Sequence, residues 1–433
     1  MDLVSSLFLA IPRVRRRATA FAAVMLAAAS VFSNTIYAED VPLSSASTPP
    51  ELPELRYVRT LPAANETYSF GMFQSGTFRL AWSPDGERLA TYTRSGLAIT
   101  TWSPDGKYQY EFPRHGFGPT AYAFGFLSGH SQIITSPAAQ NDTPDEQQAA
   151  EQNAFSVMDP ATGKVLRGVP GPNPGKTFRE NETHRLAISP DRQLAAVIYH
   201  PYAGRSIGIY STRDWLRVAV IDIDDDRNMG AQALAFSSDS TKLAIAHGRK
   251  GRVDILQVGS WTLLRTIEAF PEQPPGMQSV FLDALAFSSD GTMIAVGSGS
   301  GGVYWQYPDG SPAPEGAGNA IRQFPYDPLR VFKVDDGSLV ASAAEFAASF
   351  NDNRLAWSPA SGFLAFVDSY RQLRLWNPAR LGPPTIAVKP ERNMGGVAFS
   401  PDGAQLAVNF LNGVKIFDVI SRNGNEPKER KSR

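Results

Sequence analysis

One short motif recurs along this chain and limits its possible folds more than any other feature. Its clearest copy, at residues 80–86, reads Leu-Ala-Trp-Ser-Pro-Asp-Gly, and a Leu-Ala pair follows at 89–90. Close copies start at Leu234, Leu285 and Val397, looser ones at Leu186 and Leu355, and the loosest at Phe124. A unit repeated at this spacing predicts a fold made of similar structural modules.

Each copy of the motif predicts a β-hairpin. Ser at the first position, Pro at the second and Gly at the fourth suit a type I turn, and the flanking runs are short and apolar. Because side chains alternate along a strand, Leu80 and Trp82 point to one side and Ala81 to the other. The place of Ala81 is taken by Ala or Gly in all seven copies. Radial sheets need this pattern, in which the bulky face of one sheet packs into the shallow face of the next.

The spacing of the copies predicts an all-β, seven-bladed β-propeller with four-stranded antiparallel blades. The large residues that mark the copies are Trp82, Phe126, Ile188, Phe236, Phe287, Trp357 and Phe399. They lie about 42 to about 70 residues apart, and a period of roughly 40–45 is typical of propeller blades. The longer intervals indicate insertions at 136–153 in blade 2 and at 297–327 in blade 5.

The third strand of blade 5 has two candidates. We prefer residues 329–334, because Asp-Asp-Gly at 335–337 then supplies the expected turn. Residues 303–305 would in that case form an extra hairpin on the rim. In blades 3 and 4 we expect the fourth strands to begin at Trp215 and Trp261.

The last blade lacks a fourth strand at the C-terminal end of the chain. Its third strand ends near Asp418, and the charged tail at 420–433 does not have the pattern of a strand. Residues 55–61, Leu-Arg-Tyr-Val-Arg-Thr-Leu, resemble residues 263–267, which overlap the fourth strand expected in blade 4. We therefore predict that the N-terminal strand completes the last blade, which closes the ring and removes an open sheet edge.

The repeats at residues 55–419 resemble those of WD-repeat β-propellers, and here of an exported bacterial type. The resemblance lies in the element Ala-(Phe or Trp)-Ser-Pro-Asp-Gly followed by Leu-Ala. The family's Gly-His pair is missing, and the Asp of the turn before the third strand is replaced, for example by Ser300. We therefore expect these blades to depend on apolar packing more than on the family's His–Asp network.

The N-terminal residues predict export. Arginines at 13–17 precede an apolar run at 18–32, which is short for a membrane span, and a cleavage site is expected after Ala38. Residues 1–38 are thus interpreted as a signal peptide, with an uncleaved signal anchor as the alternative, and residues 39–54 as a flexible linker. The absence of cysteine fits a bacterial periplasm, so we expect a periplasmic or secreted protein with no stable membrane span after signal removal.

Composition and motifs provide no positive sign of chemistry. The formal net charge is -1, which does not suggest a nucleic-acid partner, and the lack of cysteine rules out thiolate sites. The five histidines are scattered, with no local metal-binding pair, and no Gly-x-Ser-x-Gly elbow is present. We accordingly predict no metal, no cofactor, no catalytic residues and a monomer.

The best functional signal is a basic face. Loops between second and third strands share one face of a propeller, and here they carry Arg94, His200, Tyr202, Arg205, His247, Arg249, Lys250, Arg252, Tyr370 and Arg371. The only negative charges expected near this positive face are those of Asp368 and of the acidic insertion in blade 2. The selected binding candidates are Arg94, Arg205, Arg249, Arg252, Tyr370 and Arg371.

Two functions remain open from the sequence. The favoured one is a non-enzymatic scaffold that binds a protein or an anionic envelope component on this face. The alternative is a propeller enzyme, such as a lactonase-like hydrolase, with a site in the central channel. Carboxylates or Asn side chains that converge at the channel mouth would favour the enzyme, whereas a channel lined only by Ala, Ser and aliphatic residues would count against it.

Overall fold

The regular structure is entirely β-strand in the part of the chain that can be described. The computed structural model describes residues 51–62, 77–93, 98–107, 109–111, 124–127, 132–135, 153–171, 183–199, 206–223, 230–247, 251–271, 282–298, 304–307, 311–313, 321–323, 327–344, 354–368, 370–380, 382–389, 394–410 and 413–421. The predicted signal peptide, most of the linker and nearly all of the charged tail lie outside these residues. Within them, no helix is long and apolar enough to cross a membrane.

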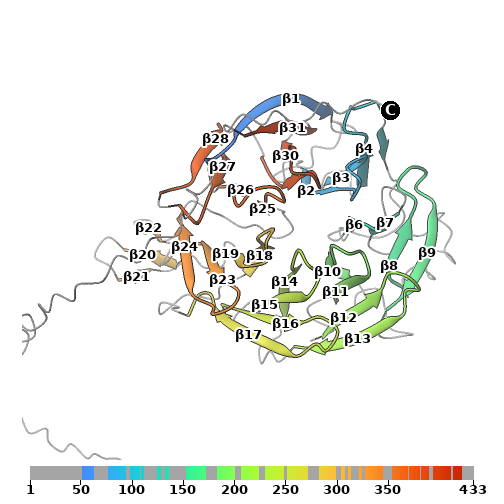
Figure 1. The fold of residues 1–433 in the computed structure, drawn as a ribbon, viewed down its shortest axis with the longest axis horizontal. Coiled ribbons are helices and arrows are strands. Elements are labelled where there is room, and N and C mark those ends of the chain that lie inside the picture. The colour runs from blue at the N-terminus through green and yellow to red at the C-terminus, as the bar shows by residue number, and fades with distance from the viewer. Residues whose placement is uncertain are drawn as a thin grey trace, which may run out of the picture. The chain divides into compact units, whose positions relative to one another are not determined.

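Seven four-stranded antiparallel sheets form a ring, as predicted (Figure 1). Blades 1 to 3 are β2(Thr77–Trp82), β3(Leu89–Thr93), β4(Ala98–Trp102), β5(Gln109–Glu111); β6(Phe124–Phe126), β7(Ile133–Thr135), β8(Asn153–Met158), β9(Val165–Pro170); and β10(Thr183–Ile188), β11(Leu194–Tyr199), β12(Ser206–Ser211), β13(Arg217–Asp222). Blades 4 to 6 are β14(Ala231–Phe236), β15(Lys242–His247), β16(Arg252–Gln257), β17(Leu263–Glu268); β18(Leu282–Phe287), β19(Met293–Ser298), β23(Leu329–Lys333), β24(Leu339–Ala343); and β25(Leu355–Trp357), β26(Leu364–Val367), β27(Leu373–Trp376), β28(Thr385–Val388). In the blades whose first strand is labelled, β2, β6, β10, β14, β18 and β25 are the innermost strands (Figure 1), and β29 lies at the sheet edge opposite the outermost strand β1.

Blade 7 combines the two ends of the described chain. It consists of β29(Val397–Phe399), β30(Gln405–Phe410), β31(Gly413–Ile420) and, as its outermost strand, β1(Glu54–Pro62). The pairing runs from Glu54 opposite Ile420 to Pro62 opposite Gly413. The predicted closure of the ring by the N-terminal strand is confirmed, with the strand starting one residue earlier than expected.

The repeated motif is a turn that its own side chains hold. In the first copy, Ser83 Oγ accepts a hydrogen bond from the backbone N–H of Arg88 at 2.8 Å and donates to Asp85 Oδ1 at 2.6 Å. The Asp85 carboxylate also accepts the N–H of Glu87, and Gly86 donates to the Ser83 carbonyl with a φ of 72°. The positive φ explains the preference for Gly at the fourth position. Ser and Asp of the motif are therefore structural.

Large residues of one blade pack against the small position of the blade before it, as the alternation predicted. Trp82 of blade 1 donates its indole N–H to the carbonyl of Ala398 in blade 7, at 3.1 Å. Trp357 of blade 6 makes the same bond to Ala286 in blade 5, at 2.9 Å. At the small position of blade 2, a Cβ added to Gly125 would lie 2.8 Å from Ile188 Cδ1.

Two details differ from the sequence prediction. The fourth strands of blades 3 and 4 begin two residues later than expected, because Trp215 and Trp261 belong to the preceding turns with φ values of 63° and 57°. The Trp215 ring, whose centroid lies 5.5 Å from that of Phe155 in blade 2, packs against the neighbouring blade instead of continuing a strand.

The blade 5 insertion contains more structure than the predicted hairpin. Strand β23 pairs with β19 and supplies the third strand of the blade, so the preferred candidate is confirmed. Strands β20(Tyr304–Gln306), β21(Pro312–Ala313) and β22(Ile321–Gln323) form a separate three-stranded sheet.

Candidate functional site

The strand order defines two faces of the propeller. Connections from second to third strands, and from each blade to the next, emerge on one face, which we call the loop face. Turns from first to second and from third to fourth strands emerge on the other, which we call the turn face. The described binding candidates are all at the loop-face ends of their strands: Arg252 begins β16, and Tyr370 and Arg371 lie between β26 and β27. Arg94, Arg205 and Arg249 lie outside the described residues.

In blade 4, Arg252 belongs to a partly buried polar cluster. Its Nη2 lies 3.3 Å from Asp254 Oδ2, and His247 Nε2 lies 2.7 Å from the same oxygen. Thr266 donates to Asp254 Oδ1 at 2.7 Å. Burial alone would raise the pKa of Asp254, but the contacts with His247 and Thr266 and the charge of Arg252 lower it below its ordinary value. The side chains of Arg252 and His247 therefore hold this blade together, and only part of Arg252 faces solvent.

The Asp368 carboxylate does not oppose the basic face, because it is fully buried. One of its oxygens accepts the N–H groups of Tyr370 and Gln372, at 2.9 and 2.8 Å. The other accepts Nε of Arg374 at 2.6 Å. Asp368 thereby fixes the turn that carries Tyr370, which is 69% exposed, and Arg371.

A cavity of about 320 Å³ lies along the innermost strands, where the central channel runs. Its charged lining residues are Arg79 of blade 1, Arg185 of blade 3, Asp283 of blade 5 and Arg354 of blade 6. The rest of the lining is aliphatic and aromatic, including Leu234 and Phe236 of blade 4. The surface that this cavity presents is nevertheless mainly polar. Three arginines against one aspartate give the described lining an excess of two positive charges.

The three arginines occupy the same position of the repeat. Each immediately precedes the large residue that opens the motif, namely Leu80, Leu186 or Leu355. Arg79 pairs with Tyr92 and Arg185 with Ile198, near the end of the second strand, so these side chains belong to the loop-face end of the channel. The other four blades have Ala or Gly at this position.

Bulges lie next to Arg79, Arg185 and Asp283 in the innermost strands. The pairing of first and second strands shifts between Thr77 and Arg79, between Thr183 and Arg185, and between Leu282 and Ala284. Asp283 lies between the two paired residues Leu282 and Ala284 and is the extra residue of its bulge. It lines the channel cavity. Arg185, which is 4% exposed, donates from Nε to the carbonyl of Gln232 in blade 4 at 2.9 Å and so is held in place.

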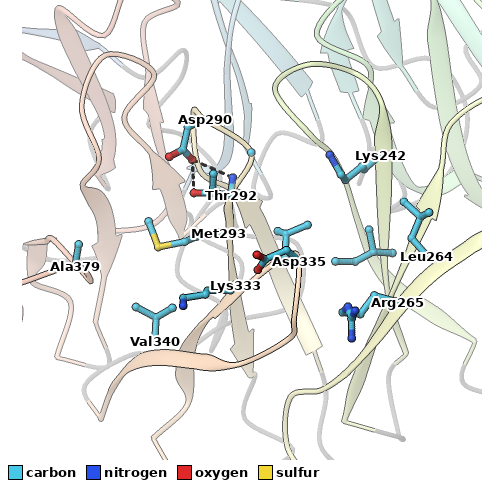
Figure 2. A pocket seen from close by; sticks show the side chains of 13 residues that line it. Lys242, Leu264, Arg265, Asp290, Thr292, Met293, Lys333, Asp335, Val340 and Ala379 are labelled. Atoms are coloured by element: carbon cyan, nitrogen blue, oxygen red, sulfur yellow. Dashed lines mark hydrogen bonds between the residues drawn. The ribbon is translucent and has the colours of Figure 1, made fainter. Parts of the chain in front are cut away.

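A second, larger pocket of about 710 Å³ lies on the turn face (Figure 2). It spans blades 4, 5 and 6, with Leu264 and Arg265 on one side of Asp335 and Met293, Val340 and Ala379 on the other (Figure 2). Most of the surface that lines it is apolar. We call it the turn-face pocket.

Charges around the turn-face pocket compensate one another. Lys242 lies 3.8 Å from Asp239, whose pKa is lowered to about 2 against the effect of burial by hydrogen bonds from Ser237 and Thr241 and by the lysine. The Asp290 carboxylate accepts the N–H and hydroxyl of Thr292 at 3.0 and 2.8 Å (Figure 2). Hydrogen bonds from Ser338, and then the charges of Lys333 and Arg265, lower the pKa of Asp336. The pocket therefore offers apolar surface with little net charge.

The channel differs from both of the sequence expectations for it. It is not lined only by Ala, Ser and aliphatic residues, and its described charged lining is dominated by arginine, with Asp283 as the single carboxylate. Sequence reasoning missed this site, although the arginine before the large residue in three copies was visible. Among the described residues, no group of three His, Asp or Glu side chains is arranged to hold a metal ion.

Comparison with known proteins does not assign the chain to a family. No protein-family model matches the sequence, and a search of curated proteins finds no match.

Proposed function

We propose that this chain is an exported, non-enzymatic β-propeller that binds a protein or an anionic component of the cell envelope on its loop face. The observation that carries the proposal is the set of arginines at the channel mouth. Arg79, Arg185 and Arg354 come from three separate blades and line one cavity at the loop-face end of the channel. A cleft with an excess of one charge sign attracts a ligand of the opposite sign.

The loop face also offers an anchor for a larger partner. Tyr370 is the most exposed of the large apolar or aromatic side chains whose exposure is described, and its backbone N–H donates to the buried Asp368 carboxylate. Exposed tyrosine and arginine side chains are enriched at protein interfaces, since they provide contact area together with hydrogen bonding. A partner seated on this face would contact Tyr370 and Arg371 at the rim while an anionic group enters the mouth.

The test is capture from an envelope extract with the purified chain immobilised. Two triple charge reversals are compared: Arg79→Glu, Arg354→Glu and Arg371→Glu at the channel mouth and on the loop face, against Lys242→Glu, Arg265→Glu and Lys333→Glu on the turn face. We expect a salt-sensitive partner that the wild-type chain and the turn-face variant retain and that the loop-face variant loses. Equal recovery by both variants, or loss from the turn-face variant alone, would contradict the proposal.

A further inference from the structure

We propose that the channel mouth is a binding site for a small hydroxylated carboxylic acid, such as a hydroxy acid or a sugar acid. This inference rests on the proposed function and names the chemistry that the loop face recognises, whether the acid is free or the end group of a larger partner. In this site, the ligand carboxylate contacts the arginines of the mouth, and a ligand hydroxyl donates a hydrogen bond to Asp283.

The arginines determine the anionic part of the ligand. A guanidinium presents planar, parallel N–H donors that match the two oxygens of a carboxylate, and such charge-assisted pairs are stronger than neutral hydrogen bonds. Arg79, Arg185 and Arg354 share one register of the innermost strands, so their positive charge gathers at one level of the channel. The apolar residues around them, such as Leu234 and Leu285, reduce the screening of this charge by water.

Asp283 determines the second part of the ligand. An ionised carboxylate only accepts hydrogen bonds, so a ligand that fills the cavity must present a donor where it meets Asp283. A ligand with oxyanions on every side would instead place negative charge against this carboxylate. A hydroxyl group next to a carboxylate meets both requirements, because it donates to Asp283 while the carboxylate faces the arginines.

The size of the cavity fits a ligand of this class. Its volume of about 320 Å³ lies at the lower end of the range for small-molecule sites, roughly 300–1,000 Å³. From the level of Arg185 to that of Ile188 the innermost strand advances three residues, or about 10 Å at 3.3 Å per residue. A single sugar ring or a short hydroxy acid fits that depth. The turn-face pocket is larger and mostly apolar. Its lining has three cationic and two anionic residues, a smaller excess than in the channel, and these residues share no single position of the repeat.

Calorimetric titration of the purified chain tests the inference with four probes. Glucuronate offers a carboxylate and hydroxyls, glucose hydroxyls only, glutarate carboxylates only, and inorganic phosphate a compact oxyanion. We expect saturable binding of glucuronate, with each of the other probes at least tenfold weaker. Undetectable binding of glucuronate, or tighter binding of glutarate, phosphate or glucose, would overturn the inference.

Variants locate the site. Arg185→Gln is expected to weaken glucuronate binding at least tenfold, and Arg185→Lys by less, whereas Lys333→Gln in the turn-face pocket should leave it within twofold. Asp283→Asn should weaken glucuronate and strengthen glutarate, a change of preference that general loss of structure does not produce. Unchanged affinity in Arg185→Gln, or parallel changes for both probes in Asp283→Asn, would contradict the assignment.

Two further results keep the test decisive. Arg185 is buried and bonded to a backbone carbonyl, so if its Gln variant does not fold, Arg79→Gln and Arg354→Gln take its place, with the same expected loss. If the envelope partner is captured through the loop face while glucuronate does not bind, the proposed function stands and this inference fails. If glucuronate binds and no partner is captured, the inference stands and the docking of a partner fails.

Discussion

The channel mouth and the turn-face pocket are built from the same repeated blades, yet they differ in every property that decides what they bind. The mouth is small, mainly polar and dominated by three arginines. The turn-face pocket has about twice the volume, is mainly apolar, and has lysines and arginine next to aspartates. Size alone therefore does not identify the functional surface of this propeller; an excess of one charge among the described lining residues, at one position of the repeat, is more informative.

The origin of the two sites explains the difference. The turn face consists of copies of the Ser-x-Asp turn, in which the aspartates serve the backbone: Asp85, Asp191, Asp239, Asp290 and Asp402 each accept a serine hydroxyl. Because this chemistry is the same in most blades, it reflects the requirements of the fold. The mouth differs from blade to blade, with arginine in three copies and Ala or Gly in four. The three arginines therefore mark a position where these blades differ from the common repeat, and we assign this difference to a ligand.

The largest expected effect comes from removing the arginines together. The combined change Arg79→Gln, Arg185→Gln and Arg354→Gln should lower glucuronate affinity more than 100-fold, because hydrogen bonds that involve a charged group are worth about 1.5–3 kcal/mol each. Equilibrium dialysis with labelled glucuronate measures the loss. The matched control, Lys242→Gln, Arg265→Gln and Lys333→Gln, should stay within about twofold. If both triple variants lose binding equally, the contrast between the two sites is wrong.

A second prediction concerns the buried carboxylate under the loop face. Asp368→Asn leaves Arg374 without its buried ionic partner and should reduce the free energy of unfolding by about 3 kcal/mol. Urea denaturation measures this change. The loosened turn should also weaken partner capture through Tyr370. A loss below about 1 kcal/mol would show that Asp368 does not hold the loop-face turn as the structure indicates.

A third prediction separates structural from ligand-binding aspartates. Asp290 accepts hydrogen bonds from Ser288 and Thr292, so Asp290→Ala should cost about 1 kcal/mol of stability and leave glucuronate binding unchanged. These hydrogen bonds lower the pKa of Asp290 in the folded state against the effect of burial. Its contribution is therefore fully present above the unfolded pKa of about 3.9 and lost as pH falls through the lower folded value.

The pH dependence supplies the measurement for Asp290. Thermal melts between pH 7 and pH 2 should show that the difference between wild type and Asp290→Ala is constant above about pH 5 and shrinks below about pH 4. A difference that grows in acid would contradict the assigned hydrogen bonds. Weakened glucuronate binding in this variant would instead connect the turn face to the ligand.

The smallest expected effect comes from Lys333, at the edge of the turn-face pocket. Lys333→Gln removes an exposed charge whose nearby partner, Asp336, is also exposed, so its effect on stability should be within about 0.5 kcal/mol. Melting temperature and glucuronate affinity should both remain close to wild type. A clear loss of affinity would move the ligand to the turn face.

Much of the fold was predictable from the sequence, because it depends on local signals. The Ser-Pro-Asp-Gly turn, the alternation of Leu80, Ala81 and Trp82, and the strand-like residues 55–61 were sufficient for seven blades and for ring closure. The starts of the fourth strands in blades 3 and 4 were not predictable. Trp215 and Trp261 adopt a left-handed backbone conformation that favours glycine, and only the packing of their side chains explains this conformation.

The channel site was only partly accessible to sequence reasoning. The arginine before Leu80, Leu186 and Leu355 is a visible pattern, but its meaning depends on where the innermost strand points that residue. Bulges lie next to Arg79 and Arg185, and Asp283, the extra residue of another bulge, also lines the cavity. The burial of Asp368 and the ion pair between Arg252 and Asp254 depend on three-dimensional contacts, which the spacing of residues in the sequence does not reveal.

One measurement tests the central contrast directly: hydrogen exchange followed by mass spectrometry, with and without saturating glucuronate. We predict slower exchange in peptides that contain Arg79, Arg185, Asp283 and Arg354, and unchanged exchange in those at 288–292 and 333–340, which border the turn-face pocket. Slower exchange at 288–292 and 333–340 with no change at the four channel residues would contradict it.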